Sequence, residues 1–366
     1  MRYVIDKNER PVYLQLYKRI RDDIISGVYP YGGKLPSERT LSEETGVSTV
    51  TIEHAYWLLC DEGYAQSRER SGYYVIFRRL DGFAAAGERY ETVPSASAAV
   101  APPDYPVFPV SVMCRTMRKV LTNRYDAILE KTQGTGCEEL RIAIRDYLAR
   151  NRGIYTDADR IVVGSGAEYL YGLIITMLGK DTVYAVESPS YEKIEKIYRS
   201  AGAKYETLPL SRDGIETRAL FASHADVLHT TPYRSYPSGI TASASKRHEY
   251  IRWSDEKEGR FIIESDYGSE FAVAAQPMET LFALADRDNV IYLNTFARTI
   301  SPSIRVGYMV LPQRLVATFA ETVGFYSCSV PTFEQYVIAE LLAGGDFERH
   351  VNRVRRNMRK AITAKQ

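Results

Sequence analysis

Apolar residues in the first part of the chain recur at the spacing of an α-helix. From position 12 onward, one helical face is formed by Tyr13, Leu16, Tyr17, Ile20 and Ile24. Gly27 follows this face, and a turn-rich segment over residues 29–33 comes next. The pattern therefore predicts a helix that begins near residue 12 and ends at Gly27.

Two serines predict where the next two helices begin. Ser37 can cap a short helix over residues 38–45, which Gly46 ends. Ser48 can cap the helix after it. The buried face of that later helix is predicted to comprise Val47, Ile52, Ala55, Tyr56 and Leu59. A helix, a tight glycine turn and a second capped helix form the unit that places one helix in the major groove of DNA.

Two strand-like runs follow these helices. Residues 64–68 and 72–76 flank the polar tripeptide 69–71, and this spacing predicts a β-hairpin. Residues 1–77 are thus expected to form a winged helix-turn-helix domain, mostly α with a β wing.

The rest of the chain divides into a linker and a larger region. Residues 78–106 are rich in Ala, Pro, Gly and Ser and are expected to form a solvent-exposed linker. Over residues 107–366, apolar strands alternate with amphipathic helices, as in RIVVGSG followed by EYLYGLIITMLG. This alternation predicts an α/β domain with a parallel sheet.

Composition excludes several classes of protein. The 366 residues are 45% hydrophobic and 25% charged with a net charge of +1, which predicts a globular protein without overall attraction to polyanions or membranes. No apolar stretch reaches the roughly 18–20 residues of a membrane span. The four cysteines lie far apart, without CxxC or Cys/His clusters. We therefore expect no metal site, and buried, reduced thiols in a cytoplasmic protein.

Four segments within residues 11–76 form a specific combination. They are PVYLQLYKRIRDDIISG, LPSERTLSEETGVS, AYWLL and EGYAQSRERSGYYV. Together they resemble the GntR family of winged helix-turn-helix regulators, which implies binding to double-stranded operator DNA as a homodimer. By position, the residues that the resemblance assigns to DNA contacts are Arg39, Ser48, Thr49, Thr51, Arg68, Arg70 and Gly72.

The charge of this domain limits its expected affinity. Residues 1–80 hold 12 Lys and Arg against 11 Asp and Glu. Family members usually carry arginine at the position of Thr49, and MocR-type members carry it at the position of His54 as well. Because phosphate contacts dominate affinity, we expect weaker DNA binding, or a stronger dependence on dimerisation, than in a typical member. A helix-turn-helix kept only as a structural module is the alternative.

The second region places short polar segments after its predicted strands. They are VGSGAE at 163–168, PSY at 189–191, TP at 231–232, PSG at 237–239, ESDY at 264–267, TFART at 295–299 and RVGY at 305–308. In this order they resemble the fold-type I aminotransferases, in the form fused to GntR domains in the MocR subfamily. The resemblance implies an α/β large domain of the pyridoxal 5′-phosphate (PLP) transferase fold over residues 107–366, apparently truncated before the family's small domain.

The resemblance also assigns a cofactor pocket. Backbone N–H groups at a helix start favour a phosphate. In the family, the phosphate of PLP is held by the residues that correspond to Ser165, Gly166, Ala167, Thr295 and Arg305. Tyr191 corresponds to the aromatic residue that stacks on the cofactor ring, and the ESDY segment adds Ser265 and Tyr267 to the pocket.

Position 298 departs from the family. The family has Thr-Phe-Ser-Lys-Thr where this chain has TFART, so Arg298 stands at the position of the lysine that forms an imine with PLP. Arginine stays protonated, with a pKa above about 12, and cannot form this imine. We therefore expect no covalently bound cofactor and no catalytic residue. Arg298 would either fill the cofactor space or clamp a phosphate-bearing or other anionic ligand non-covalently, and the alternative is a decayed pocket kept only as a dimerisation scaffold.

A second departure lies in the ESDY segment. By alignment, Ser265 replaces the aspartate that pairs with the pyridine nitrogen of PLP. Asp266 is adjacent, but consecutive strand residues point to opposite faces of a sheet. We expect this contact to be lost, although a shift of the alignment by one residue would restore it.

These features predict a DNA-binding transcriptional regulator with a catalytically degenerate aminotransferase-like domain for dimerisation or effector binding. The alternative is a PLP-dependent aminotransferase with a fused DNA-binding domain, which needs an amine that position 298 does not provide. A third class, a purely structural or partner-binding protein, is distinguished by the absence of DNA binding.

Overall fold

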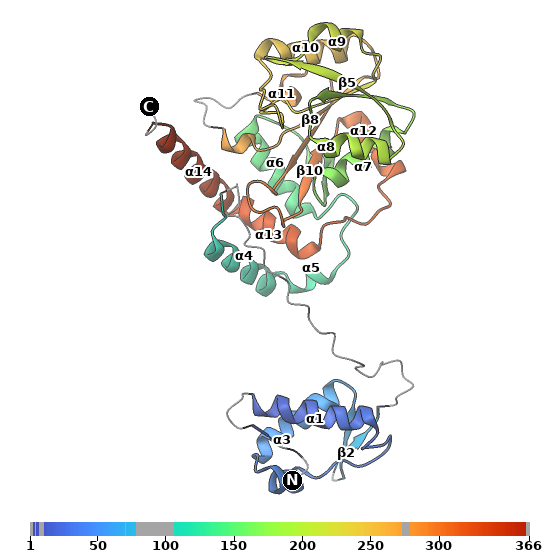
Figure 1. Ribbon diagram of the computed structural model, residues 1–366, viewed down its shortest axis with the longest axis vertical. Helices are drawn as coiled ribbons and strands as arrows, with labels where there is room; N and C mark the ends of the chain where they lie inside the picture. The colour runs from blue at the N-terminus through green and yellow to red at the C-terminus, as the bar shows by residue number, and fades with distance from the viewer. Residues whose placement is uncertain are drawn as a thin grey trace. The chain divides into compact units, whose positions relative to one another are not determined.

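The structure, a computed structural model, describes residues 3, 5–6, 11–69, 71–77, 106–272 and 279–363. The chain forms two compact units, residues 1–99 and residues 100–366 (Figure 1). The predicted linker 78–106 lies outside the described residues except for Pro106.

Three helices form the core of the first unit. They are α1 Val12–Ser26, α2 Glu38–Thr45 and α3 Thr49–Asp61. Ser37 and Ser48 each accept a hydrogen bond from a backbone N–H group in the first turn of the helix that follows. Gly27 at φ 88° and Gly46 at φ 65° end α1 and α2 in the left-handed conformation. The helix starts and ends predicted from these four residues are therefore confirmed.

The apolar faces of these helices meet in one core. Its buried residues include Leu16, Tyr17, Ile20, Ile24, Leu41, Val47, Ile52, Ala55, Tyr56 and Leu59. Tyr13 packs against the same core, as its place on this helical face predicts, but it is only partly buried. Its ring stacks on His54 with the centroids 4.1 Å apart. The other members of the two predicted faces are buried as expected.

The predicted hairpin is present as an antiparallel pair. Its strands are β1 Ala65–Arg68 and β2 Gly72–Val75. Ala65 and Val75 face each other and bury their side chains in the core of the unit. The winged helix-turn-helix fold predicted from the sequence is confirmed.

An eight-stranded sheet forms the centre of the second unit. Its strands are β3 Ile161–Gly164, β4 Val183–Ser188, β5 Lys204–Ser211, β6 Gly214–Ile215, β7 Val227–Thr230, β8 Phe261–Ser265, β9 Val290–Thr295 and β10 Gly307–Val310. Their order is β3-β10-β9-β8-β7-β4-β5-β6. The strands from β9 to β5 run parallel, whereas β10 is antiparallel to both neighbours and β6 to β5. The predicted parallel sheet is thus a mixed one, because β6 and β10 return without the crossover helix that parallel pairing requires.

Helices cover both faces of this sheet (Figure 1). They are α4 Val110–Asn123, α5 Tyr125–Leu129, α6 Glu138–Arg152, α7 Ala167–Leu178, α8 Glu192–Ser200, α9 Thr217–Ala222, α10 Ala244–Asp255, α11 Leu281–Leu284, α12 Gln313–Thr322, α13 Thr332–Ala343 and α14 Asp346–Thr363. One face packs α7, α8 and α12 around Ile263 and Met309. The other packs α6, α13 and α14 around Tyr292, and α9, α10 and α11 around Ile262. Neighbouring residues of β8 thus enter opposite cores, as strand alternation requires.

Two further expectations concern membranes and cysteines. Within the described ranges, no helix combines the length and the apolar character that crossing a membrane requires. All four cysteines are free thiols, and Cys137 is buried. Cys114 is exposed, because it lies away from the side of α4 that packs on the core, so the prediction of buried thiols is wrong for this residue.

Candidate functional site

The start of α3 forms the first candidate site. Thr49 and Val50 lie exposed in its first turn. The Ser48 hydroxyl lies 2.8 Å from that of Thr51 and accepts a hydrogen bond from its backbone N–H group. Ser48 therefore caps the start of α3. Because the first turn of a recognition helix is the part that reaches base edges, this local geometry suits contact with DNA.

Three further predicted contact residues lie on α2 and the wing. The Arg39 side chain is 89% exposed and pairs with Glu43 one turn along α2, with Nε and Oε1 3.2 Å apart. The Arg68 guanidinium lies 4.4 Å from the ring centroid of Tyr74. Gly72 has φ 100°, a conformation that the hairpin turn needs and that other residues rarely adopt. Arg70 lies outside the described residues.

Lys34 joins this surface although the sequence pattern did not point to it. Its Nζ lies 5.9 Å from the ring centroid of Tyr74, the same ring that Arg68 contacts. A bridge between Lys34 and Tyr74 attaches this residue to the hairpin. Lys34 and Arg68 thus both lie near the ring of Tyr74 on the wing. The sequence pattern did not indicate this because Lys34 and Tyr74 are 40 residues apart.

The second candidate site, called here the cup, lies where β3, β8 and β9 end. Gly166 opens α7 at φ 92°, and a Cβ atom there would lie 3.4 Å from Nη2 of Arg305. A Cβ on Gly307 would lie 3.1 Å from the carbonyl oxygen of Asn294 and 3.2 Å from Cα of Gly166. Because neither glycine has a side chain, the start of α7 lies close to Arg305 and to the end of β9. Thr295, the residue after Asn294, is therefore near Gly166 as well.

Hydrogen bonds hold the edges of the cup. The backbone N–H group of Ser165 donates to the Ser329 hydroxyl at 3.0 Å. The Thr295 hydroxyl donates to the carbonyl oxygen of Val306 at 3.1 Å. Ala167 begins α7 directly after Gly166. Two groups that the sequence assigned to a phosphate thus have partners within the protein.

Glu168 is the feature of the cup that sequence reasoning missed. Its carboxylate accepts hydrogen bonds from Nη2 of Arg305 at 2.9 Å and from Nζ of Lys193 at 2.6 Å. The hydrogen bonds from Lys193 and Arg305 lower the pKa of Glu168, and the bond to Glu168 raises the pKa of Lys193. The carboxylate therefore stays ionised and the amine stays an ammonium. Arg305 and Glu168 lie 137 positions apart, so no local pattern signals the pair.

Ser265 and Asp266 point to opposite faces of the sheet. The Ser265 hydroxyl lies 2.7 Å from that of Tyr171 on α7, and both are buried. Asp266 forms a buried ion pair with Arg152 at 2.7 Å and accepts a hydrogen bond from Tyr292 at 2.7 Å. The predicted opposite orientation of the two side chains is confirmed, and the carboxylate next to Ser265 has partners on the other side of the strand.

Arg298 packs against the loop that follows β8. Its guanidinium carbon lies 5.3 Å from the ring centroid of Tyr267. A Cβ atom on Gly268 would lie 2.6 Å from Cδ of Arg298, so the arginine side chain lies directly on the glycine backbone. Tyr191 is 38% exposed, and Nζ of Lys193 lies 5.8 Å from its ring centroid. Both tyrosines predicted for the pocket thus have a cation near the ring.

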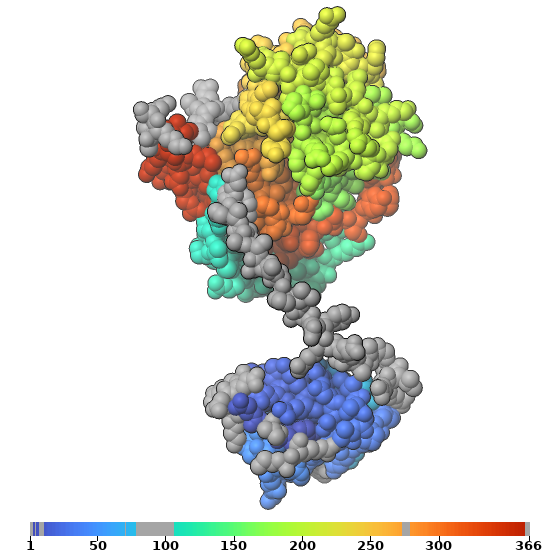
Figure 2. Space-filling model, in the orientation of Figure 1, coloured from blue at the N-terminus to red at the C-terminus, as the bar shows by residue number. Residues whose placement is uncertain are grey.

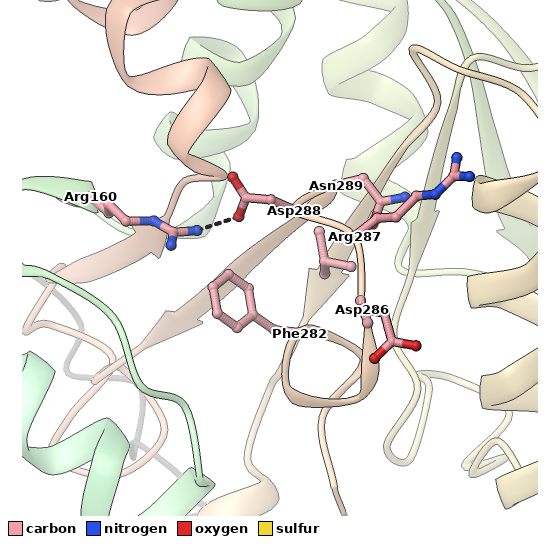
Figure 3. Close-up of a pocket in the computed structure, with 8 residues that line it drawn as sticks. Arg160, Phe282, Asp286, Arg287, Asp288 and Asn289 are labelled. Atoms are coloured by element: carbon pink, nitrogen blue, oxygen red, sulfur yellow. Dashed lines mark hydrogen bonds and ion pairs between the residues drawn. The ribbon is translucent and has the colours of Figure 1, made fainter.

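A small cavity elsewhere in the second unit is separate from the cup. It has a volume of about 160 Å³ and is lined by Arg160, Phe282, Asp286, Arg287, Asp288 and Asn289 (Figure 3). Arg160 pairs with Asp288 at 2.6 Å and donates a hydrogen bond to the carbonyl oxygen of Leu311. Arg160 and Asn289 precede β3 and β9, so this cavity lies at the edge of the sheet opposite the cup.

Comparison with protein families agrees with the two units. Residues 12–75 match the model of the bacterial regulatory proteins of the gntR family. Residues 104–365 match the model of aminotransferase class I and II. The second match covers more than half of the chain, so the chain belongs to the aminotransferase class I and II family, joined to a gntR-type winged helix-turn-helix domain.

Curated relatives share both parts. The chain is 28% identical over 364 residues to the uncharacterized HTH-type transcriptional regulator YdeL of Bacillus subtilis, covering 96% of this chain and 77% of that protein. It is 28% identical over 378 residues to the probable rhizopine catabolism regulatory protein MocR of Rhizobium meliloti, and the match covers 96% of this chain and 76% of that protein. It is also 28% identical over 347 residues to the pyridoxine biosynthesis regulator PdxR of Corynebacterium glutamicum, covering 93% and 75%. The predicted resemblance to MocR-type regulators is confirmed.

Solved structures show the fold of the larger unit. The kynurenine aminotransferase of Pyrococcus horikoshii matches with a TM-score of 0.61 and 23% identity, over 69% of this chain and 66% of that one. The multiple substrate aminotransferase of Thermococcus profundus matches with a TM-score of 0.63 and 20% identity, over 69% and 66%. The chain thus spans slightly less than two thirds of these enzymes and about three quarters of the curated relatives. The predicted fold-type I aminotransferase-like domain is confirmed.

Proposed function

We propose that this chain is a DNA-binding transcriptional regulator of the MocR type, which acts in the cytoplasm as a homodimer and whose aminotransferase-like domain catalyses no transamination. One combination of features carries the proposal. The capped and exposed start of α3 occurs in the same chain as Arg298, a guanidinium at the position where the family has its reactive lysine. A relative named as an HTH-type transcriptional regulator and one named as a catabolism regulatory protein each match over 96% of the chain.

Titration of DNA with the full chain tests this function. A labelled duplex from the region upstream of the protein's own gene is followed by fluorescence anisotropy at increasing salt. We expect saturable binding at low salt that weakens as salt rises, because Lys and Arg displace counterions from phosphates. Absence of binding at low salt contradicts the proposal and favours a structural or partner-binding protein.

The cup does not fit PLP held as an imine. Arg298 has no neutral amine to offer, and Lys193 is kept protonated by its hydrogen bond to Glu168. Ser265 places a hydroxyl bound to Tyr171 where the family's aspartate is expected. We therefore propose that the domain binds at most a phosphate-bearing or other anionic ligand without a covalent bond. The alternative function, a PLP-dependent aminotransferase, requires an amine that attacks the aldehyde of PLP, and these residues supply none.

Replacing Glu168 by glutamine is expected to raise the affinity of the cup for inorganic phosphate about 5-fold. The change removes a carboxylate that repels the anion and occupies Arg305, and the effect stays modest because Arg305 is more than half exposed. Calorimetric titration of the full chain with phosphate measures it. Glu192→Gln is the matched control, because Glu192 pairs with Lys196 rather than with Arg305. Equal gains in both variants would show that Glu168 does not occupy Arg305 in solution.

Exposed apolar side chains support the proposed homodimer. Six large apolar side chains on α4, on α5 and in the segment after α12 are each at least 48% exposed. They are Val110, Leu121, Tyr125, Leu129, Phe325 and Tyr326. Figure 2 shows α4 and α5, in teal, at the surface of the second unit. Gly134, which follows α5, lies against the carbonyl oxygen of Tyr326, so the segments are neighbours. Apolar surface gathered in this way is typical of a protein interface.

Replacing Leu129 by aspartate is expected to raise the dissociation constant of the dimer at least 10-fold, because a charge would be buried without a partner. Sedimentation velocity over a range of protein concentrations measures the change. Tyr155→Asp is the control, since Tyr155 is 81% exposed and lies outside this group. An unchanged dimer fraction in Leu129→Asp would place the interface elsewhere.

A further inference from the structure

The outward face of α3 is apolar and acidic rather than basic. Val50, Glu53, His54 and Trp57 follow one another at positions i, i+3, i+4 and i+7, and all four are exposed. Residues at this spacing share one face of a helix. The sequence of α3, TVTIEHAYWLLCD, contains no lysine or arginine. This face therefore has no guanidinium or ammonium group with which to contact base edges, so any direct contact must use its apolar, acidic or aromatic side chains.

Two of these four residues have aromatic partners. The His54 ring stacks on Tyr13 of α1, with centroids 4.1 Å apart and planes at 23°. Trp57 lies next along the helix, with its ring centroid 6.2 Å from that of His54. These rings line a groove of about 570 Å³ that extends to Tyr73 of the wing, and Val50 and Glu53 line the same groove. In the first half of the helix, Val50 and Glu53 are thus the exposed groove residues that have no ring partner among the described residues.

Glu53 offers a carboxylate with no partner in the described part of the chain. Its oxygens take part in no hydrogen bond or ion pair there, and the residue is exposed. A carboxylate only accepts hydrogen bonds. In the major groove, cytosine presents the N4 amino group as a donor, guanine presents two acceptors, and adenine presents a donor beside the acceptor N7. Cytosine is therefore the base that Glu53 fits, and guanine is the base that it repels.

Val50 lies one helical turn before Glu53 and is 72% exposed. An apolar side chain at the start of a recognition helix fits the C5-methyl group of thymine. Three residues advance a helix by about 4.5 Å, which is close to the rise of about 3.4 Å between successive bases. This spacing suits contacts of the two side chains with neighbouring base pairs.

We infer that Glu53 is the specificity-determining residue of α3, accepting a hydrogen bond from N4 of a cytosine in each half-site, with Val50 on the methyl group of a neighbouring thymine. The inference rests on the proposed function, because it requires that α3 enters the major groove. Contacts of the wing and α2 with phosphates provide affinity for DNA. The Glu53 carboxylate provides specificity, because it disfavours other base pairs at its position.

Selection from a pool of duplexes with randomised positions tests this role with the full chain. Wild type is expected to select sites with one nearly invariant cytosine. Glu53→Gln is expected to change that position to adenine, because an amide pairs with N6 and N7 of adenine. Glu53→Ala is expected to lose the preference, so that discrimination at this position falls about 5- to 150-fold, which is the effect of losing one good contact between a side chain and a base. Val50→Ala is expected to weaken only the preference for thymine.

Glu44→Gln is the matched control, because Glu44 is an exposed carboxylate on α2 and its variant should select the same sites as wild type. If all Glu53 variants select the wild-type base at every position, the inference is wrong while the proposed function stands. If the wild-type chain enriches no duplex even at low salt, both are wrong. All four substitutions lie on exposed side chains, and circular dichroism verifies that each variant is folded.

Discussion

Arg298→Lys is expected to convert a chain that forms no imine with PLP into one that does. Lysine at this position can lose its proton when the site is desolvated, and a neutral amine attacks the aldehyde. Arginine cannot, because its charge is delocalised and permanent. The visible absorbance of a lysine–PLP imine, recorded with one equivalent of PLP, measures the change. The expected result is near-stoichiometric imine in the variant and none in wild type.

Arg305→Lys is the control for this experiment, because it places an amine in the same cup away from position 298. Arg305 already contacts Glu168, so a lysine there is expected to stay protonated and to give no imine. If Arg305→Lys formed an imine and Arg298→Lys did not, position 305 rather than position 298 would correspond to the reactive lysine of the family. Imine formation in wild type would contradict the proposed loss of covalent binding.

Thr49→Arg is expected to tighten DNA binding about 10-fold at low salt. Thr49 lies exposed in the first turn of α3, and a cation there gains a contact with the duplex in each subunit. One added phosphate contact steepens the dependence of log K on log salt by about 1 per subunit. Anisotropy titrations of one duplex at several salt concentrations measure both quantities.

Ser26→Arg is the matched control for Thr49→Arg. It adds the same charge to the same domain, at the last residue of α1 rather than at the start of α3. Its affinity is expected to change less, and its salt slope to stay near that of wild type. If Thr49→Arg leaves affinity and slope unchanged, Thr49 does not face the duplex.

The helix-turn-helix was predictable because its signals are local. Ser37 and Ser48 cap helices through backbone N–H groups a few residues away, and Gly46 ends α2 from the next position. These contacts lie within one turn, so the sequence carries them directly. The stacking of Tyr13 on His54 was not predictable, because helical periodicity identifies a face, whereas this contact depends on how α1 crosses α3.

The cup was predictable only where strand geometry decided the outcome. Opposite orientations of Ser265 and Asp266 follow from the alternation of a strand, and the partners Tyr171 and Arg152 agree with it. The pairing of Arg305 with Glu168 had no such signal. It arises because β10 returns antiparallel beside β3 and brings distant segments together.

The central claim is that the cup contains no amine able to capture the aldehyde of PLP. Intact mass and peptide mapping of the wild-type chain, after incubation with one equivalent of PLP and reduction with borohydride, test it most directly. We predict no phosphopyridoxyl adduct on the peptides that contain residues 165–193 and 295–305. A stoichiometric adduct on any side chain of those peptides, together with turnover of an amino acid, would contradict the account.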